Sequence, residues 1–185
     1  MNLQTGDILF TSRKPEIGEP KTYVAFAINL IQTKKIHNLD RIPTHTAQVI
    51  VLYGVVYVID SDVKGVILQP YEKWAKGRSF IIVYRPNVLL SIKGVDTYIK
   101  EALELSGNRY GFKSAGHLAL FLMTGRKNAK ATSDINKIAC SIYTAYLYRA
   151  FIPDIFQSPI SLFNNCKLKK GEKGKYFIDG YFVDL

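Results

Sequence analysis

The stretch His45-Thr46-Ala47-Gln48-Val49-Ile50-Val51-Leu52-Tyr53-Gly54-Val55-Val56-Tyr57-Val58-Ile59-Asp60 decides the fold. It holds two apolar, β-branched runs, residues 46–53 and 55–60, with Gly54 between them, which predicts an antiparallel hairpin. Pairing across a turn at Gly54 brings His45 opposite Asp60 or Asp62. Side chains alternate along a strand with a period of two, so both aspartates share one face and the pattern leaves both open. Asp60 directly follows the apolar run and is favoured, whereas Asp62 is expected on an exposed turn.

Working outward, further β-type segments surround this hairpin. The sequence predicts strands at residues 6–10, 65–69 and 79–84, a short helical turn at 70–74, and a helix at 21–34. From residue 91 the apolar period becomes helical and predicts helices at 91–107, 112–123 and 141–151, followed by a strand or hairpin within 175–183. An antiparallel sheet followed by helices is an α+β fold.

Composition sets the class of protein. The 185 residues, 48% of them hydrophobic, fit one folded domain over residues 1–185. No apolar stretch approaches the ~18 residues of a membrane span, and the start lacks the pattern of a signal peptide, so a cytoplasmic location is the default expectation. The two cysteines, Cys140 and Cys166, show no metal-ligand spacing, and no metal or other cofactor is expected. A disulfide between them would block Cys140 as a nucleophile, which favours a reducing compartment.

The formal net charge of +10 leaves two interpretations open. It fits a solvated, lysine-rich surface, which is the commoner case, or a surface that binds nucleic acid, an anionic polymer or an anionic membrane. The densest group of lysines is Lys167, Lys169, Lys170, Lys173 and Lys175. No recognisable nucleic-acid-binding motif accompanies these charges.

Cys140 opens the predicted helix Cys140-Ser141-Ile142-Tyr143-Thr144-Ala145-Tyr146-Leu147-Tyr148-Arg149, after the polar loop at 131–137. A cysteine at a helix N-terminus feels the positive end of the helix dipole, which favours the thiolate. A thiolate with a histidine base attacks amide and ester carbonyls, and the base needs an acceptor on its other nitrogen. Cys140, His45 and Asp60 or Asp62 are therefore candidate catalytic residues, although each also fits a purely structural role. His37, His117 and Cys166 lack this context.

Motifs in a fixed order strengthen the catalytic interpretation. They are Gly-Asp-Ile-Leu-Phe at 6–10, His45, Val-Ile-Asp at 58–60, Gly-Val at 65–66, Pro70, Trp74, Tyr-Arg-Pro at 84–86, Gly-Asn-Arg-Tyr-Gly-Phe at 107–112, Cys-Ser at 140–141 and Tyr-Arg at 148–149. In this order they resemble the circularly permuted, YiiX/YebB-like branch of the NlpC-type papain-like cysteine hydrolases. The resemblance implies a permuted papain-like fold in which the histidine precedes the cysteine along the chain.

The resemblance also implies roles for single residues. Cys140 matches the nucleophile, His45 the base, and Asp60 the acidic third position, where relatives often carry glutamate. Tyr110 matches a tyrosine of a substrate-side loop, and the backbone N–H groups at Cys140 and Ser141 are expected to hold the oxyanion. The implied reaction is acyl transfer without a metal, on an amide of cell-wall peptide or on a lipid-linked amide or ester. The alternative is a non-catalytic basic module that binds nucleic acid or an anionic membrane surface.

Overall fold

The computed structural model describes residues 2–13, 43–62, 64–86, 94–110, 137–148, 159, 162–163 and 177–183. Several predictions from the sequence lie outside these residues. They are the helices at 21–34 and 112–123, the histidines His37 and His117, Cys166, and the lysine group at 167–175.

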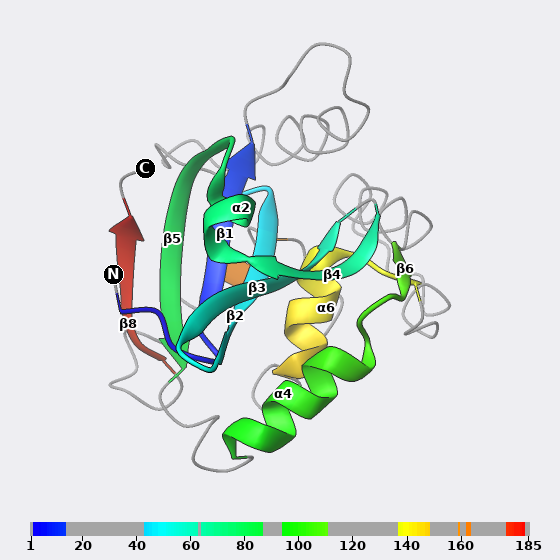
Figure 1. Ribbon diagram of the computed structural model, residues 1–185. Coiled ribbons are helices and arrows are strands. Elements are labelled where there is room, and N and C mark those ends of the chain that lie inside the picture. Colours follow the sequence, from blue (N-terminus) through cyan, green and yellow to red (C-terminus); the bar gives the residue numbers. More distant parts are fainter. Residues whose placement is uncertain are drawn as a thin grey trace.

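A six-stranded sheet in the order β4-β3-β2-β1-β5-β8 forms the centre of the protein (Figure 1). Its strands are β1 (Ile8–Arg13), β2 (His45–Leu52), β3 (Val55–Asp62), β4 (Gly65–Pro70), β5 (Arg78–Pro86) and β8 (Phe177–Val183). Every neighbouring pair is antiparallel. Together with the helices this confirms the α+β class, and the tail forms a single strand at the edge of the sheet.

The β2–β3 hairpin confirms the pairing predicted across Gly54. Its register runs from Leu52 opposite Val55 to Gln48 opposite Ile59. Tyr53 and Gly54 form the turn with φ of 51° and 77°, the left-handed geometry that two-residue hairpin turns require at both positions. β3 is longer than predicted, because its pairing with β4 continues as far as Asp62 opposite Gly65. The expectation that Asp62 lies on an exposed turn is therefore wrong: it is half-buried within the strand.

The helices pack on opposite faces of the sheet. The short helix α2 (Tyr71–Ala75) places Trp74 against Val49 and Val58 on one face. On the other face α6 (Cys140–Leu147) packs with Ile50 and Ile59, and α4 (Val95–Glu104) lies beside it, as Figure 1 shows. The alternation of side chains along β2 and β3 separates these two apolar layers.

α6 is buried almost all round, as expected for a helix with apolar residues on every side. Its tyrosines are tied to neighbouring segments: Tyr143 donates to the carbonyl of Ala102 at 3.0 Å, and Tyr148 donates to the carbonyl of Gly6. A two-stranded parallel pair, β6 (Arg109–Tyr110) and β7 (Lys137–Ile138), precedes α6. Lys137 thus belongs to a strand and not to the predicted polar loop.

Candidate active site

The hairpin brings His45 and Asp60 into direct contact. His45 Nε2 lies 2.8 Å from Asp60 Oδ2, and the two side chains are 15% and 1% exposed. Continuing the Gln48–Ile59 register would place Asp62 opposite His45. The imidazole instead reaches Asp60, its diagonal neighbour on the same face of the sheet, a separation that long side chains span.

Two residues near α2 hold Asp60 in place. Trp74 donates its indole N–H to Asp60 Oδ2 at 2.6 Å, and the Arg78 guanidinium lies 3.5 Å from the same oxygen. Arg78 also donates from Nε to the Trp74 carbonyl at 3.2 Å and stacks 4.3 Å from the centroid of the Trp74 ring. The contacts of His45, Trp74 and Arg78 converge on this one oxygen and fix it in place, and a fixed carboxylate fixes the imidazole that it binds.

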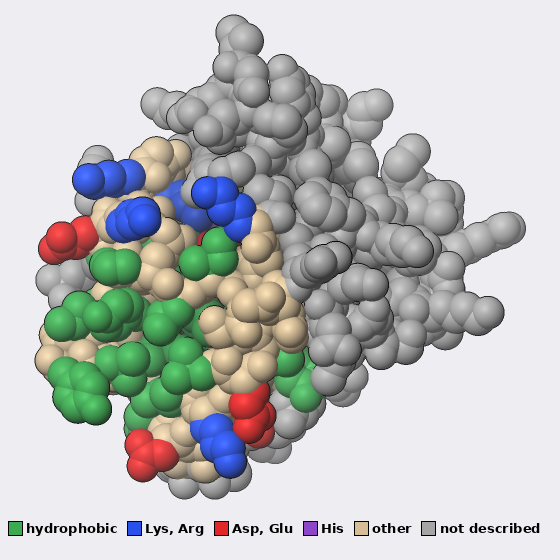
Figure 2. All heavy atoms as spheres, turned by 45° about the vertical axis from the view of Figure 1, so that its right-hand side comes forward, with side chains coloured by type: hydrophobic (Ala, Val, Ile, Leu, Met, Phe, Trp, Pro, Cys, Tyr) green, Lys and Arg blue, Asp and Glu red, His purple; other side chains and the backbone are tan. Residues whose placement is uncertain are grey.

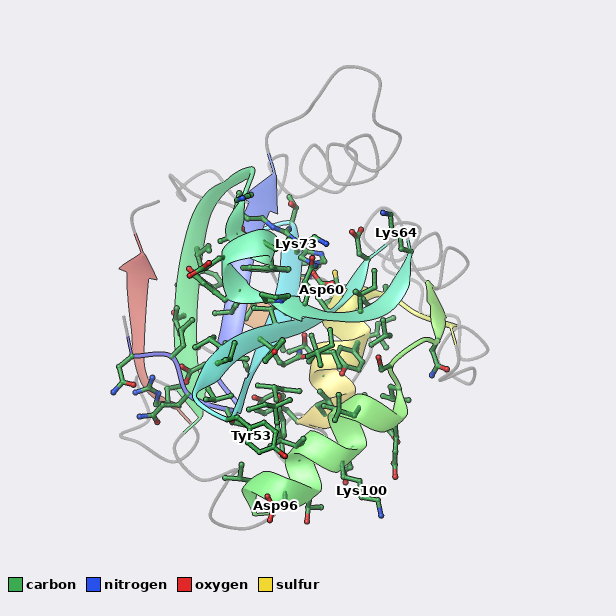
Figure 3. The ribbon with its side chains drawn as sticks, in the orientation of Figure 1. Tyr53, Asp60, Lys64, Lys73, Asp96 and Lys100 are labelled. Carbon is green, nitrogen blue, oxygen red and sulfur yellow. The ribbon has the colours of Figure 1, made fainter. Side chains whose placement is uncertain are left out.

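The start of α6 places Cys140 beside this pair. The chain enters the helix through Ala139 in an extended conformation, with no side-chain cap. Cys140 is 5% exposed and shares hydrogen bonds with the His45 side chain and with the backbone N–H of Thr46. Because His45 Nε2 is bound to Asp60, Nδ1 is the nitrogen that faces the thiol. Figure 3 shows Asp60 on β3 close to the first turn of α6.

The pKa values of these groups shift in opposite directions. Burial disfavours imidazolium, but the Cys140 thiolate and the hydrogen bond to Asp60 outweigh it and raise the pKa of His45 to about 9. Burial also disfavours the thiolate, yet the charge and hydrogen bond of His45 and the N–H of Thr46 lower the pKa of Cys140. Burial opposes ionisation of Asp60, but its bonds to His45, Arg78 and Trp74 lower its pKa. Both shifts favour the thiolate–imidazolium pair over the neutral thiol and imidazole.

The other two predicted site residues are placed less directly. Ser141 follows Cys140 in the first turn of α6 and is fully buried, and its Oγ has no hydrogen-bond partner in the part of the chain that the structure describes. The backbone of Tyr110 lies in β6, next to Ile138 of β7 and so near the start of α6 in the chain. Its side chain lies outside the described residues.

Sequence reasoning missed most of the groups that hold this arrangement. Trp74 is among the ordered motifs and the predicted helical turn but has no role assigned there, and Arg78, Gln48 and Thr144 are not singled out at all. Thr144 had one signal in the sequence, since it follows Cys140 by one helical turn. Arg78 had none, because its contact with Asp60 depends on how α2 lies over β3.

Comparisons with known proteins give a structural likeness without a sequence likeness. No protein-family model matches the chain, and no curated protein matches it either. Among solved structures, the chain is similar to the metalloprotein YiiX from Escherichia coli O157:H7, a DUF1105 protein, with a TM-score of 0.57 and 14% sequence identity. The match covers 100% of this chain and 98% of that one. At this identity the likeness shows a shared fold.

The description of YiiX as a metalloprotein raises the question of a metal in this chain. Within the described ranges, no three His, Cys, Asp or Glu side chains are arranged to hold a metal ion. Of the site's own candidate donors, His45 Nε2 and Asp60 Oδ2 are hydrogen-bonded to each other. The described residues therefore do not fit a metal centre at this position.

Charged side chains are not spread evenly over the surface that Figure 2 shows. Among the described residues on that face, most Lys and Arg side chains gather along the upper border. Acidic side chains lie at the upper and lower borders, and hydrophobic side chains lie between these two borders. Tyr53 and Val55, at the end of the β2–β3 hairpin, are exposed hydrophobic residues. Among the described residues, no helix is long and apolar enough to cross a membrane.

Proposed function

We propose that the protein is a cysteine hydrolase of the permuted papain-like, NlpC-type kind, acting by acyl transfer on an amide or ester. The observation that carries the proposal is the chain of contacts from Cys140 through His45 to Asp60. These are the nucleophile, base and orienting group that thiol-dependent acyl transfer needs, joined in the required order. The likeness to YiiX supports the fold part of the proposal.

In the proposed reaction, the Cys140 thiolate adds to the substrate carbonyl and forms a tetrahedral intermediate. Backbone N–H groups at the uncapped start of α6 stabilise its oxyanion. His45, as imidazolium, gives its Nδ1 proton to the leaving amine or alcohol as the C–N or C–O bond breaks. The neutral imidazole then takes a proton from water, which attacks the thioester and releases the acid and the thiolate. His45 ends protonated, as it began.

The substrate class follows the family resemblance and the surface of the protein. Candidates are a cell-wall peptide amide and a lipid-linked amide or ester. The anionic polymers or membranes that carry such groups also suit a chain of net charge +10. The alternative function is a basic module that binds nucleic acid or an anionic membrane without catalysis. The depressed pKa of Cys140 favours the hydrolase, because a binding module has no use for an activated thiol.

An activity-based electrophilic probe, applied at neutral pH, tests the proposal. We expect Cys140 to be labelled in the wild type, with labelling lost in Cys140→Ala and strongly reduced in His45→Gln. Quantifying the Cys166 peptide in the same digests gives an internal reference thiol. Equal labelling of both cysteines, together with steeply salt-dependent binding to nucleic acid or anionic vesicles, would support the alternative.

A further inference from the structure

A buried cluster of polar side chains lies between α6 and β2, directly behind Cys140. Thr144 occupies the position one turn after Cys140 and is fully buried. Its Oγ1 lies 3.0 Å from the Cys140 carbonyl oxygen and 2.8 Å from Thr46 Oγ1, and it also bonds the Gln48 side-chain amide. Thr46 and Gln48 are fully buried as well. The polar cluster therefore lies within the otherwise apolar layer that α6 shares with the sheet.

Counting hydrogens fixes the direction of each bond in this cluster. A threonine hydroxyl has one hydrogen to donate and two lone pairs to accept with. The Thr144 hydrogen is donated to the Cys140 carbonyl, and the Gln48 amide nitrogen donates to Thr144 Oγ1. The hydroxyl of Thr46 must then be the donor in its bond to Thr144 Oγ1. Thr144 thus uses its full hydrogen-bonding capacity, and α6 is tied to two residues of β2.

Thr46 links this cluster to the sulfur atom. Its backbone N–H bonds the Cys140 thiolate, while its side chain bonds Thr144 on the same helix. Thr46 also follows His45 directly in β2. Two bonds from one strand residue therefore fix both the sulfur and the helix that carries it, next to the histidine that pairs with that sulfur.

A contribution to folding stability alone does not explain this cluster well. Gln48 Oε1 is buried and has no hydrogen-bond partner within the described ranges. A buried polar atom without a partner costs about 1–3 kcal/mol, and apolar side chains of the same shape would avoid that cost. The placement of the cluster, against the Cys140 carbonyl, suggests a role in geometry instead.

We propose that Thr144, held by Thr46 and Gln48, is a positioning residue that sets the first turn of α6 against β2 and thereby the Cys140 sulfur beside His45. The inference rests on the proposed function, because it assigns the cluster a task in preparing that nucleophile. Thr144 does not touch the reacting atoms. It acts through the helix, so its removal affects thiolate formation while leaving His45 and Asp60 in place.

The test is the pH dependence of Cys140 alkylation by iodoacetamide in the full-length protein, with the Cys140 peptide quantified by mass spectrometry. Thr144→Val keeps the shape of the side chain and removes the hydroxyl. We expect its alkylation midpoint to lie about one pH unit above that of the wild type, which is a loss of about tenfold in rate at a pH below both midpoints. Thr144→Ser restores the hydroxyl and should recover most of the wild-type rate.

Thr5→Val is a matched control. Thr5 is also buried, and its Oγ1 accepts the N–H of Val51, outside the Cys140 cluster. It should lower the melting temperature without moving the Cys140 midpoint. If Thr144→Val does not fold, Thr46→Val takes its place, since it removes one bond to Thr144 and keeps the backbone N–H, and a smaller shift in the same direction is expected.

The outcomes separate the two proposals. An ordinary thiol midpoint near ~8.5 in the wild type overturns the proposed function itself. A depressed wild-type midpoint that Thr144→Val and Thr46→Val both leave unchanged overturns the positioning role alone. An equal shift in Thr5→Val and Thr144→Val also overturns it, because a general loss of stability would then explain the result.

Discussion

Replacing Asp60 by asparagine should change the proton affinity of His45 in a measurable way. Asp60 raises the pKa of His45 through a 2.8 Å hydrogen bond and through its charge. His45 Nε2 and the indole N–H of Trp74, 2.6 Å away, both contact Asp60 Oδ2. In Asp60→Asn the amide oxygen can take the place of Oδ2 and accept both N–H groups, but it carries no charge. A neutral acceptor supports the protonated ring less than a carboxylate does, so the imidazolium is disfavoured.

The magnitude follows from the loss of the charged acceptor. A hydrogen bond to a charged group is worth about 1.5–3 kcal/mol, and one pKa unit corresponds to 1.36 kcal/mol. The pKa of His45 should therefore fall from about 9 in the wild type to ~7–8 in Asp60→Asn. The Cys140 midpoint should change less, because the charge of Asp60 itself opposes the thiolate while its support of imidazolium favours it.

NMR titration of the histidine rings measures this pKa without a substrate. The chain has three histidines, so a His45→Gln spectrum assigns the signal. Asp62→Asn is the control, because Asp62 lies on the same strand face while the groups that raise the pKa of His45 are Cys140 and Asp60. A midpoint still near 9 in Asp60→Asn would refute the reasoning, and an equal fall in Asp62→Asn would reassign the third residue.

Three further outcomes can be checked by unfolding experiments. Trp74→Phe keeps the buried ring and loses the N–H to Asp60, so the free energy of unfolding should fall by about 1–3 kcal/mol in urea titrations; an unchanged value would contradict the contact. Tyr53→Asn should raise it by about 0.5–1 kcal/mol, because Tyr53 is fully exposed with φ of 51°, a geometry that asparagine tolerates better; lower stability would count against this. Stability should rise as pH increases toward 6.5, since the unfolded chain protonates both His45 and Cys140 there, whereas the lowered pKa of Cys140 makes the folded pair bind fewer protons. With the folded pair as thiolate and imidazolium, each state binds one proton between 6.5 and about 9, so the pair should add no slope there; a stability maximum at acidic pH would contradict the assignment.

The local sequence pattern was sufficient to predict the hairpin, but it was insufficient to decide whether Asp60 or Asp62 contacts His45. Alternating β-branched residues around Gly54 define the register, and the structure has that register. Register alone, however, points from His45 to Asp62. The contact with Asp60 depends on Trp74 and Arg78, which approach from a helix and a strand that follow later in the chain. No periodicity in the hairpin carries that information.

The ends of elements were harder to predict for a related reason. β3 continues through the polar residues Ser61 and Asp62 because β4 supplies partners as far as Gly65. Lys137 belongs to β7 because β6 pairs with it from a distant part of the chain. In both places pairing with a neighbouring strand overrides a local sequence that is typical of loops.

The charges of the site explain how so many ionisable groups can be buried together. When all are ionised, the charged groups of the site form a row in which each group contacts one of opposite sign. In order they are Cys140, His45, Asp60 and Arg78. Isolated buried ions cost several kcal/mol each, but this row sums to zero. Moving the proton from His45 to Cys140 neutralises both, and Asp60 and Arg78 still balance each other. The thiolate–imidazolium pair can thus form from thiol and imidazole without leaving net charge in a poorly solvated site, and the proposed acyl transfer starts from that pair.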